Sequence, residues 1–165
     1  MRLLDAILKA KRVFLCGNGG SAANAIHIAN DLISVGVKAQ ALTADIATLT
    51  AIANDYAYEE VFSRQLFVLA EKGDLLIVLS GSGNSKNILF ALAAAEKLQM
   101  DSFAIIGNYG AKSGAEEMAN DCLKMGRNMQ EAEEQQVYLG HAAMRKIKER
   151  GIDTYDLVAG QKKSA

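Results

Sequence analysis

Residues 12–34 read RVFLCGNGGSAANAIHIANDLIS, and this stretch decides the fold class. Its first part, 12–17, is rich in β-branched, aromatic and aliphatic residues and ends at a glycine, which predicts a buried strand. The part from Ser21 onward has helical spacing and starts with a residue type suited to an N-cap, which predicts a helix over 21–34. The stretch is therefore a strand, a glycine-rich turn and a helix.

The rest of the chain repeats this alternation. Further strands are predicted at 37–44, 74–80, 101–107 and 121–126, and further helices at 2–10, 45–53, 58–70, 85–99, 110–119 and 128–151. Residues 54–56 are expected to form a turn. Strands that alternate with helices predict an α/β fold: a central parallel sheet of five strands in a flavodoxin-like order, with helices on both faces in a three-layer sandwich. We expect one domain over 1–165, with a disordered tail at 160–165.

Composition narrows the classes of protein to consider. The chain has 165 residues, half of them hydrophobic, and a net charge of −1. No basic stripe favours a nucleic-acid partner, and no apolar run is long enough to predict a membrane span. The N-terminal residues do not resemble a signal peptide, so we expect a cytoplasmic protein with reduced cysteines. Cys16 ends the first strand and is expected to be a small buried hydrophobe.

Two loops are candidates for binding a phosphate group. The first is CGNGGS at 16–21 and the second is SGSGNS at 80–85, and each joins a predicted strand to a predicted helix. Glycines let the backbone approach a ligand, and the helix that follows directs free N–H groups at the loop. Ser80, Ser82 and Ser85 add hydroxyl donors. Glycine and serine also form ordinary turns and caps, but two such loops on neighbouring strands favour the binding hypothesis.

A dinucleotide site is the rival interpretation of the first loop. Gly17, Gly19 and Ala22 fit the G-x-G-x-x-A pattern, which is normally accompanied by an acidic residue about 20 positions further on. Asp45 lies somewhat too far along the chain to fill that role well. This interpretation also leaves the serine loop unexplained.

The two histidines of the chain point to acid–base or metal chemistry. His27 and Asp31 are four residues apart, on one face of a helix, where they could be two metal ligands or a base and its partner. His141 follows the acidic run EAEEQQ, with Glu133 eight residues and Glu134 seven residues before it. A polar edge on an amphipathic helix, and a solvated helix start, are the simpler interpretations of these two segments.

The order of four segments resembles the sugar isomerase (SIS) superfamily, and within it the phosphoheptose isomerases. These segments are CGNGGSAANAIHIANDL, TAIANDYAYEEVFSRQL, GDLLIVLSGSGNS and EAEEQQVYLGHAA. The resemblance implies a homotetramer with active sites between subunits. It implies zinc, one per subunit, at His27, Asp31, Glu133 and His141. It further implies a phosphorylated sugar bound by Asn18, Gly19, Gly20, Ser21, Asn54, Asp55, Ser80, Gly81, Ser82, Ser85 and Glu133.

We therefore predict an aldose–ketose isomerase that converts sedoheptulose 7-phosphate to D-glycero-D-manno-heptose 7-phosphate through an enediol. Asp31 is the expected base and His141 its acid–base partner, with Glu133 or Glu134 as alternative bases because Asp31 stands where the family usually has glutamate. Two other functions fit the same resemblance. One is a scaffold that binds a replication initiator, and the other is a sugar-phosphate sensor without turnover.

Overall fold

The computed structural model describes residues 3–110 and 112–150. Seven α-helices are assigned there: α1 (Leu3–Lys9), α2 (Gly20–Ser34), α3 (Ile46–Asp55), α4 (Ser63–Leu69), α5 (Lys86–Lys97), α6 (Gly114–Met118) and α7 (Met129–Glu149). One 3-10 helix, η1, spans Tyr58–Glu60. The strands are β1 (Val13–Gly17), β2 (Ala39–Ala41), β3 (Leu75–Ser80), β4 (Asp101–Gly107) and β5 (Asp121–Met125).

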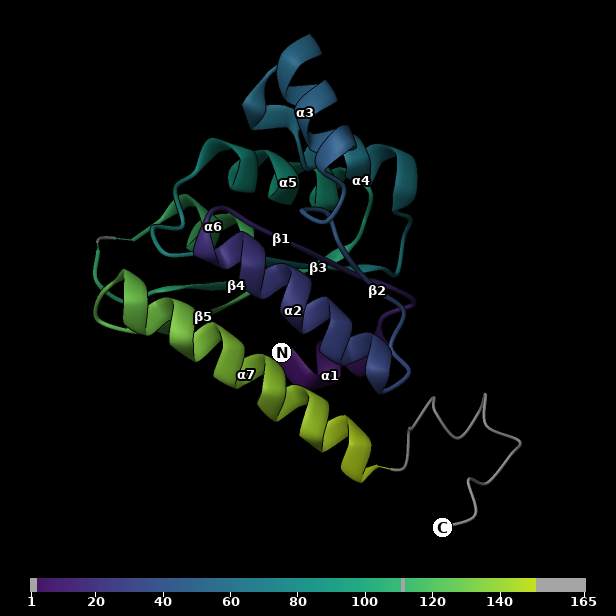
Figure 1. The fold of residues 1–165 in the computed structure, drawn as a ribbon, viewed down its shortest axis with the longest axis vertical. Helices are drawn as coiled ribbons and strands as arrows, with labels where there is room; N and C mark the ends of the chain where they lie inside the picture. The colour runs from purple at the N-terminus through teal and green to yellow at the C-terminus, as the bar shows by residue number, and fades with distance from the viewer. Residues whose placement is uncertain (1–2, 111, 151–165) are drawn as a thin grey trace.

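The five strands form one parallel sheet in the order β2-β1-β3-β4-β5. Helices α1, α2 and α7 cover one face, and α4, α5 and α6 cover the other (Figure 1). The α/β three-layer prediction and the strand order are confirmed. β1, β3 and β4 read as apolar runs because both faces of these central strands are covered by helices.

Each face of the sheet has its own hydrophobic core. Leu15, Ile77 and Ile105 pack against α2 and α7, and Phe14, Val78 and Ala104 pack against α4 and α5. Adjacent residues of a strand point to opposite faces, so the two cores alternate along each strand. Cys16 lies in the second core and is fully buried, as expected, and burial raises the pKa of its thiol.

The structure corrects three local expectations. Ser21 is not the N-cap of α2, because the helix begins at Gly20 and Ser21 is already buried inside its first turn. The strand expected at 37–44 is shortened to Ala39–Ala41. The helix expected at 58–70 is divided into η1 and α4, since Val61 and Phe62 between them insert into the core.

Other predicted elements match within a few residues, except that α6 is shorter than expected. The expected turn at 54–56 begins inside the last turn of α3. The tail at 160–165 lies outside the described residues. Within the described part, no helix combines the length and the apolar character needed to cross a bilayer.

Candidate functional site

The two glycine-rich loops lie side by side at the carboxyl edge of the sheet. β1 and β3 are neighbours, and the strand order reverses between them, since β2 lies on one side of β1 and β4 lies beyond β3. The loop after β1 leads to α2 on one face, and the loop after β3 leads to α5 on the other (Figure 1). Parallel α/β proteins bind ligands at this switch point.

The first loop requires glycine at two positions for different reasons. Gly19 has a φ of +56°, a left-handed conformation that costs glycine little, and it precedes α2 without a side-chain cap. Gly17 lies so close to the next segments that a Cβ there would be 2.6 Å from the Ser21 carbonyl oxygen. The first turn of α2 thus begins directly at the loop, with backbone N–H groups that no side chain caps.

The second loop is held in shape by its own hydroxyl and amide groups. The Ser80 Oγ accepts a hydrogen bond from the Gly83 N–H at 3.0 Å, and the Ser82 Oγ accepts one from the Asn84 N–H at 3.2 Å. Asn84 Oδ1 accepts from the Gly114 N–H at 2.9 Å, which ties the loop to α6. A cavity of about 260 Å³ adjoins this loop, lined by Gly81, Ser82, Asn84, Ile106, Gly107, Tyr109, Gly110 and Ser113.

Helix α7 packs closely on α2 and carries the second histidine to the first. A Cβ on Gly140 would lie 2.6 Å from Ile28 Cγ1, so the absence of a side chain at Gly140 permits this approach. Asn24 on α2 reinforces the contact: its Nδ2 donates to the Glu133 carbonyl oxygen at 2.9 Å and to Gln136 Oε1 at 3.0 Å. The residues next to Ile28 and Gly140 along the chain, His27 and His141, therefore meet.

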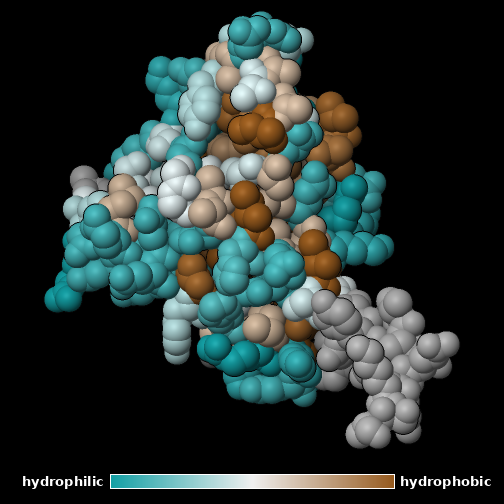
Figure 2. All heavy atoms as spheres, viewed as in Figure 1, coloured by the Kyte–Doolittle hydropathy of each residue, from teal (hydrophilic) through white to brown (hydrophobic). Residues whose placement is uncertain are grey.

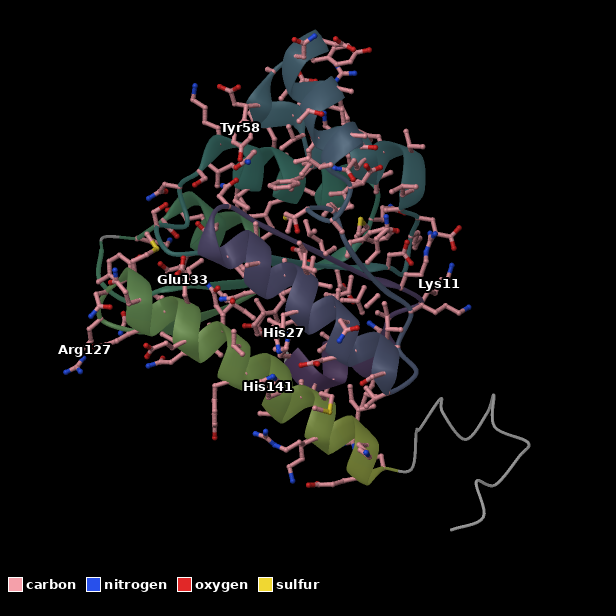
Figure 3. All side chains as sticks on the ribbon, viewed as in Figure 1. Lys11, His27, Tyr58, Arg127, Glu133 and His141 are labelled. Carbon is pink, nitrogen blue, oxygen red and sulfur yellow. The ribbon has the colours of Figure 1, made fainter. Side chains whose placement is uncertain are left out.

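Three donor atoms converge where the two helices touch. The Nε2 atoms of His27 and His141 are 2.8 Å apart, and Asp31 Oδ2 lies 3.5 Å from the first and 3.3 Å from the second (Figure 3). Asp31 Oδ2 is buried without a hydrogen bond. Among the described side chains, Gln136 Nε2 is the only other buried polar atom in this situation. The imidazoles themselves remain open to solvent, with side-chain exposures of 47% for His27 and 37% for His141.

This cluster fits a divalent transition metal. Three ligands bound tetrahedrally to one zinc ion at its usual bond lengths are about 3.3–3.6 Å apart. The distances from Asp31 Oδ2 to the two imidazole nitrogens, 3.5 and 3.3 Å, match this spacing, whereas the two nitrogens, 2.8 Å apart, would have to separate by about 0.5 Å to bind one ion. Two imidazole nitrogens and a carboxylate oxygen are also ligands that zinc accepts at open, catalytic sites. Within the described residues, these three form the group of His, Cys, Asp or Glu side chains whose ligand atoms lie close enough together to hold one metal ion.

Glu133, the fourth residue of the expected zinc set, lies at a different place. It is two turns before His141 on α7, and its carboxylate lies against Gly20, at the start of α2 (Figure 3). The pKa of Tyr109 is raised, first by burial and then by the negative charge of Glu133. Glu133 therefore lies at the edge of the glycine-rich loops, and not with the three clustered ligands.

Other predicted site residues are less closely connected to the loops. Asn54 and Asp55 are exposed at the end of α3, where Asn54 Nδ2 donates to Asp55 Oδ1 at 2.8 Å. Asp45, the acid of the dinucleotide alternative, caps α3 by accepting hydrogen bonds from Ala47, Thr48 and the Thr48 hydroxyl. The Thr48 bonds lower its pKa.

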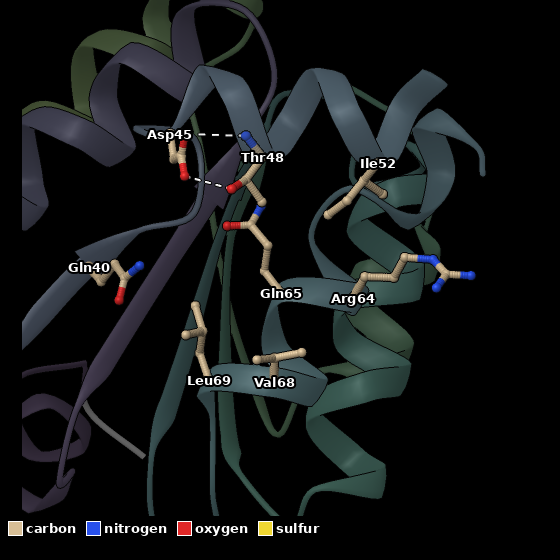
Figure 4. Close-up of a pocket in the computed structure, with 8 residues that line it drawn as sticks. All are labelled: Gln40, Asp45, Thr48, Ile52, Arg64, Gln65, Val68 and Leu69. Atoms are coloured by element: carbon tan, nitrogen blue, oxygen red, sulfur yellow. Dashed lines mark hydrogen bonds between the residues drawn. The ribbon is translucent and has the colours of Figure 1, made fainter. Parts of the chain in front are cut away.

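A larger hollow, of about 440 Å³, lies beside this cap, between the β2 edge and helices α3 and α4 (Figure 4). Its lining combines apolar residues with the polar side chains of Gln40, Thr48, Arg64 and Gln65. None of the clustered ligands or loop serines lines it. We therefore do not assign the chemistry to this hollow.

Comparison with known families agrees with the fold and the loops. A model of the SIS domain matches residues 2–107. The chain belongs to the SIS domain family. The match includes both glycine-rich loops, His27 and Asp31, and it ends before α7.

Among individual proteins, this SIS chain is similar to phosphoheptose isomerases. It is 45% identical to the phosphoheptose isomerase of Thiobacillus denitrificans over 114 residues. These residues are 66% of this chain and 58% of the relative. Phosphoheptose isomerase structures from Francisella tularensis and Neisseria gonorrhoeae share 31% and 36% identity, with TM-scores of 0.82 and 0.80. These alignments cover 88% and 89% of this chain and 82% and 81% of those chains. The chain spans about three fifths of the length of curated relatives such as those of Thiobacillus denitrificans and Helicobacter pylori.

The structure adds residues that the sequence analysis did not single out. Tyr109 follows β4 at the carboxyl edge of the sheet. Because ligands bind where parallel strands end, its place just after the predicted strand 101–107 could have marked it as a candidate site residue. Asn24, Tyr58 and Asn87 also enter the hydrogen-bond networks around the loops. Their types and spacing form no motif, so only the folded chain identifies them.

Proposed function

We propose that this SIS chain is an aldose–ketose isomerase of phosphorylated sugars, with sedoheptulose 7-phosphate as substrate and D-glycero-D-manno-heptose 7-phosphate as product. The observation that carries the proposal is the convergence of Asp31 Oδ2 with the two histidine nitrogens, on a fold shared with phosphoheptose isomerases. A scaffold that only binds a protein partner would have no use for His141 beside the buried carboxylate oxygen of Asp31.

The spacing along α2 suits a long substrate. Gly20 at the loop and His27 at the cluster are seven residues apart, which is about 10 Å along a helix. That length is comparable to an extended seven-carbon sugar phosphate. In this proposal the phosphate binds at the Ser80, Ser82 and Ser85 loop, and the reacting carbons lie toward the cluster, with Asn18 and Glu133 holding hydroxyl groups between the two ends.

The proposed chemistry moves one proton between adjacent carbons. Asp31 removes the proton from C1 of the ketose, while His141 gives a proton to the C2 carbonyl oxygen, which produces the enediol. Asp31 then returns its proton to C2, and His141 accepts the proton from the C1 hydroxyl, so no oxidant or reductant is consumed. A zinc ion, one per subunit, would be held by His27 Nε2, His141 Nε2 and Asp31 Oδ2, and it would polarise the two sugar oxygens. With those atoms bound to the ion, His141 would exchange its proton through Nδ1 and Asp31 through Oδ1.

A direct conversion assay tests this function. The purified protein, incubated with sedoheptulose 7-phosphate, is expected to form the aldose. Activity should fall at least 10-fold after chelation and return with added zinc, because a bound ion would polarise the sugar oxygens. Product formation followed by NMR measures this. A folded protein that binds the sugar phosphate without converting it, with or without zinc, would instead support the sensor function.

We further propose a homo-oligomer, expected to be a tetramer, in which α3 and α4 contribute to the contact. α3 projects from the sheet (Figure 1), and none of its ten residues is buried although most are apolar. Ile46 on α3 is 71% exposed and Val68 on α4 is 83% exposed, and hydrophobic side chains gather over this region (Figure 2). Exposed apolar surfaces of this kind favour protein contacts. Light scattering should give four times the chain mass, and a monomer would refute the proposal.

A further inference from the structure

We propose that Asn87 and Tyr58 are positioning residues that fix the orientation of the Asn18 side chain in the first loop. The inference rests on the proposed function, in which Asn18 contacts the sugar phosphate. Neither Asn87 nor Tyr58 belongs to the glycine-rich loops. Both form hydrogen bonds with Asn18, and those of Asn87 cross the switch point between β1 and β3.

The geometry is a reciprocal pair of carboxamides with a third member. Asn18 Nδ2 donates to Asn87 Oδ1 at 2.9 Å, and Asn87 Nδ2 donates back to Asn18 Oδ1 at 2.8 Å. The Tyr58 hydroxyl donates to the same Asn18 Oδ1 at 2.9 Å. Asn87 is buried in the first turn of α5, so its amide is a fixed reference for Asn18.

Counting donors and acceptors shows what remains for a ligand. A carboxamide has two lone pairs on oxygen and two hydrogens on nitrogen. Both lone pairs of Asn18 are used, one by Asn87 and one by Tyr58, and Asn87 also uses one of the two hydrogens. The second N–H of Asn18 is the group left to donate. Because the oxygen has two partners, this N–H points in one direction before any substrate arrives.

η1, which contains Tyr58, is joined by an ion pair to α5, the helix that follows the second loop. Glu59 Oε1 lies 3.3 Å from Lys86 Nζ, and Lys86 is the residue next to Asn87 at the start of α5. Tyr58, which is 58% exposed, therefore approaches Asn18 from the solvent side while Asn87 approaches it from the core side. Three segments far apart in sequence converge on one amide, and they connect both glycine-rich loops.

Such a network affects binding through preorganisation. A donor that is already oriented loses less conformational entropy when the ligand binds. Since Asn18 lies in the loop and not among the clustered ligands, we expect its orientation to matter in the ground state and in the transition state alike. A loss of this kind raises KM and leaves kcat nearly unchanged.

Tyr58→Phe is the first test, because removal of an exposed hydroxyl does not threaten the fold. We expect KM for sedoheptulose 7-phosphate to rise about fivefold, the effect of one neutral hydrogen bond, with kcat within twofold of the wild type. Tyr138→Phe, at a similarly exposed tyrosine on α7, is the matched control and should change neither constant. An unchanged KM in Tyr58→Phe would overturn the role of Tyr58.

Asn87→Asp is the second test, combined with the first in a double-mutant cycle. An aspartate has the same shape but no N–H for Asn18 Oδ1, so we expect KM to rise about 30-fold. In the Asn87→Asp background, Tyr58→Phe should raise KM less than twofold, because Asn18 has already lost its fixed orientation. Effects on KM that multiply would show that the two residues do not act through one Asn18 amide, which would overturn the inference. A lower melting temperature without any change in KM would make the two residues structural only.

A control and an independent measurement separate this inference from the proposed function. Asn120→Asp introduces the same change at the opposite edge of the sheet and keeps the oxygen that accepts from Ser102, so the KM of this variant should not change.

The side-chain NH₂ signals of Asn18 and Asn87, followed by ¹⁵N NMR, test the network without any turnover. In each pair the hydrogen bonded to the other carboxamide should exchange slowly with solvent, and the Asn18 pair should shift and exchange faster in Tyr58→Phe. Fast exchange in the wild type would overturn the inference, whereas a wild type without turnover would refute the proposed function alone.

Discussion

Replacing His141 by alanine is expected to lower kcat about 1,000-fold while the protein remains folded. The substitution removes the group that exchanges protons with the sugar oxygens, a contribution of about 100- to 10,000-fold in general acid–base catalysis. It also removes one of the three clustered ligands. The fold should tolerate the change, because the His141 side chain is 37% exposed and its partners among the described residues are the other members of the cluster. Turnover of sedoheptulose 7-phosphate and the melting temperature measure the two effects.

The control for this variant lies further along the same helix. Lys146→Ala removes an exposed side chain of α7 whose partner, Glu149, is on the same helix, so it should change neither kcat nor folding. If His141→Ala retained wild-type turnover, His141 would have no part in the reaction. A fall in activity that is matched by unfolding would instead show that His141 stabilises the contact between α2 and α7.

The sequence was sufficient for the architecture because its central strands are unambiguous. β1, β3 and β4 are short apolar runs that end at glycine or serine, and each is followed by a helix. Edge elements were predicted less well. β2 keeps three of its eight expected residues, because an edge strand pairs on one side only and its pattern is weakly constrained. The helix start at Gly20 depends on the backbone conformation of Gly19, which no side-chain pattern reveals.

The candidate site was predicted in part, for a physical reason. His27 and Asp31 share a helix face, so their spacing alone brings them together. His141 joins them only because Gly140 allows α7 to approach α2, a tertiary contact that periodicity does not encode. Conversely, Glu133 is separated from His141 by about two turns of α7, and its carboxylate remains near Gly20. The amide pair of Asn18 and Asn87 joins residues 69 positions apart, beyond the reach of any local pattern.

Zinc is expected to bind at one ion per subunit and to raise the melting temperature by about 5 to 10 °C at 100 times its dissociation constant. The increase follows from the free energy of a ligand that binds only the folded state, about 2.7 kcal/mol at that concentration, in a chain of this size. Binding should also relieve the cost of leaving Asp31 Oδ2 buried without a partner. Calorimetric titration of the chelated protein gives the stoichiometry, and thermal unfolding gives the shift.

Two variants decide whether this ion belongs to the cluster. His27→Ala should abolish the shift, because two of the three ligands cannot hold the ion tightly, and it should do so without unfolding, since His27 is exposed. Cys122→Ser is the control, because the half-buried Cys122 is the more accessible of the two thiols and a soft ligand for zinc elsewhere on the chain. It should keep the full shift. Zinc that still stabilises His27→Ala, or that no longer stabilises Cys122→Ser, would bind outside the cluster, and Asp31 and His141 would then have to perform any proton transfer without a metal.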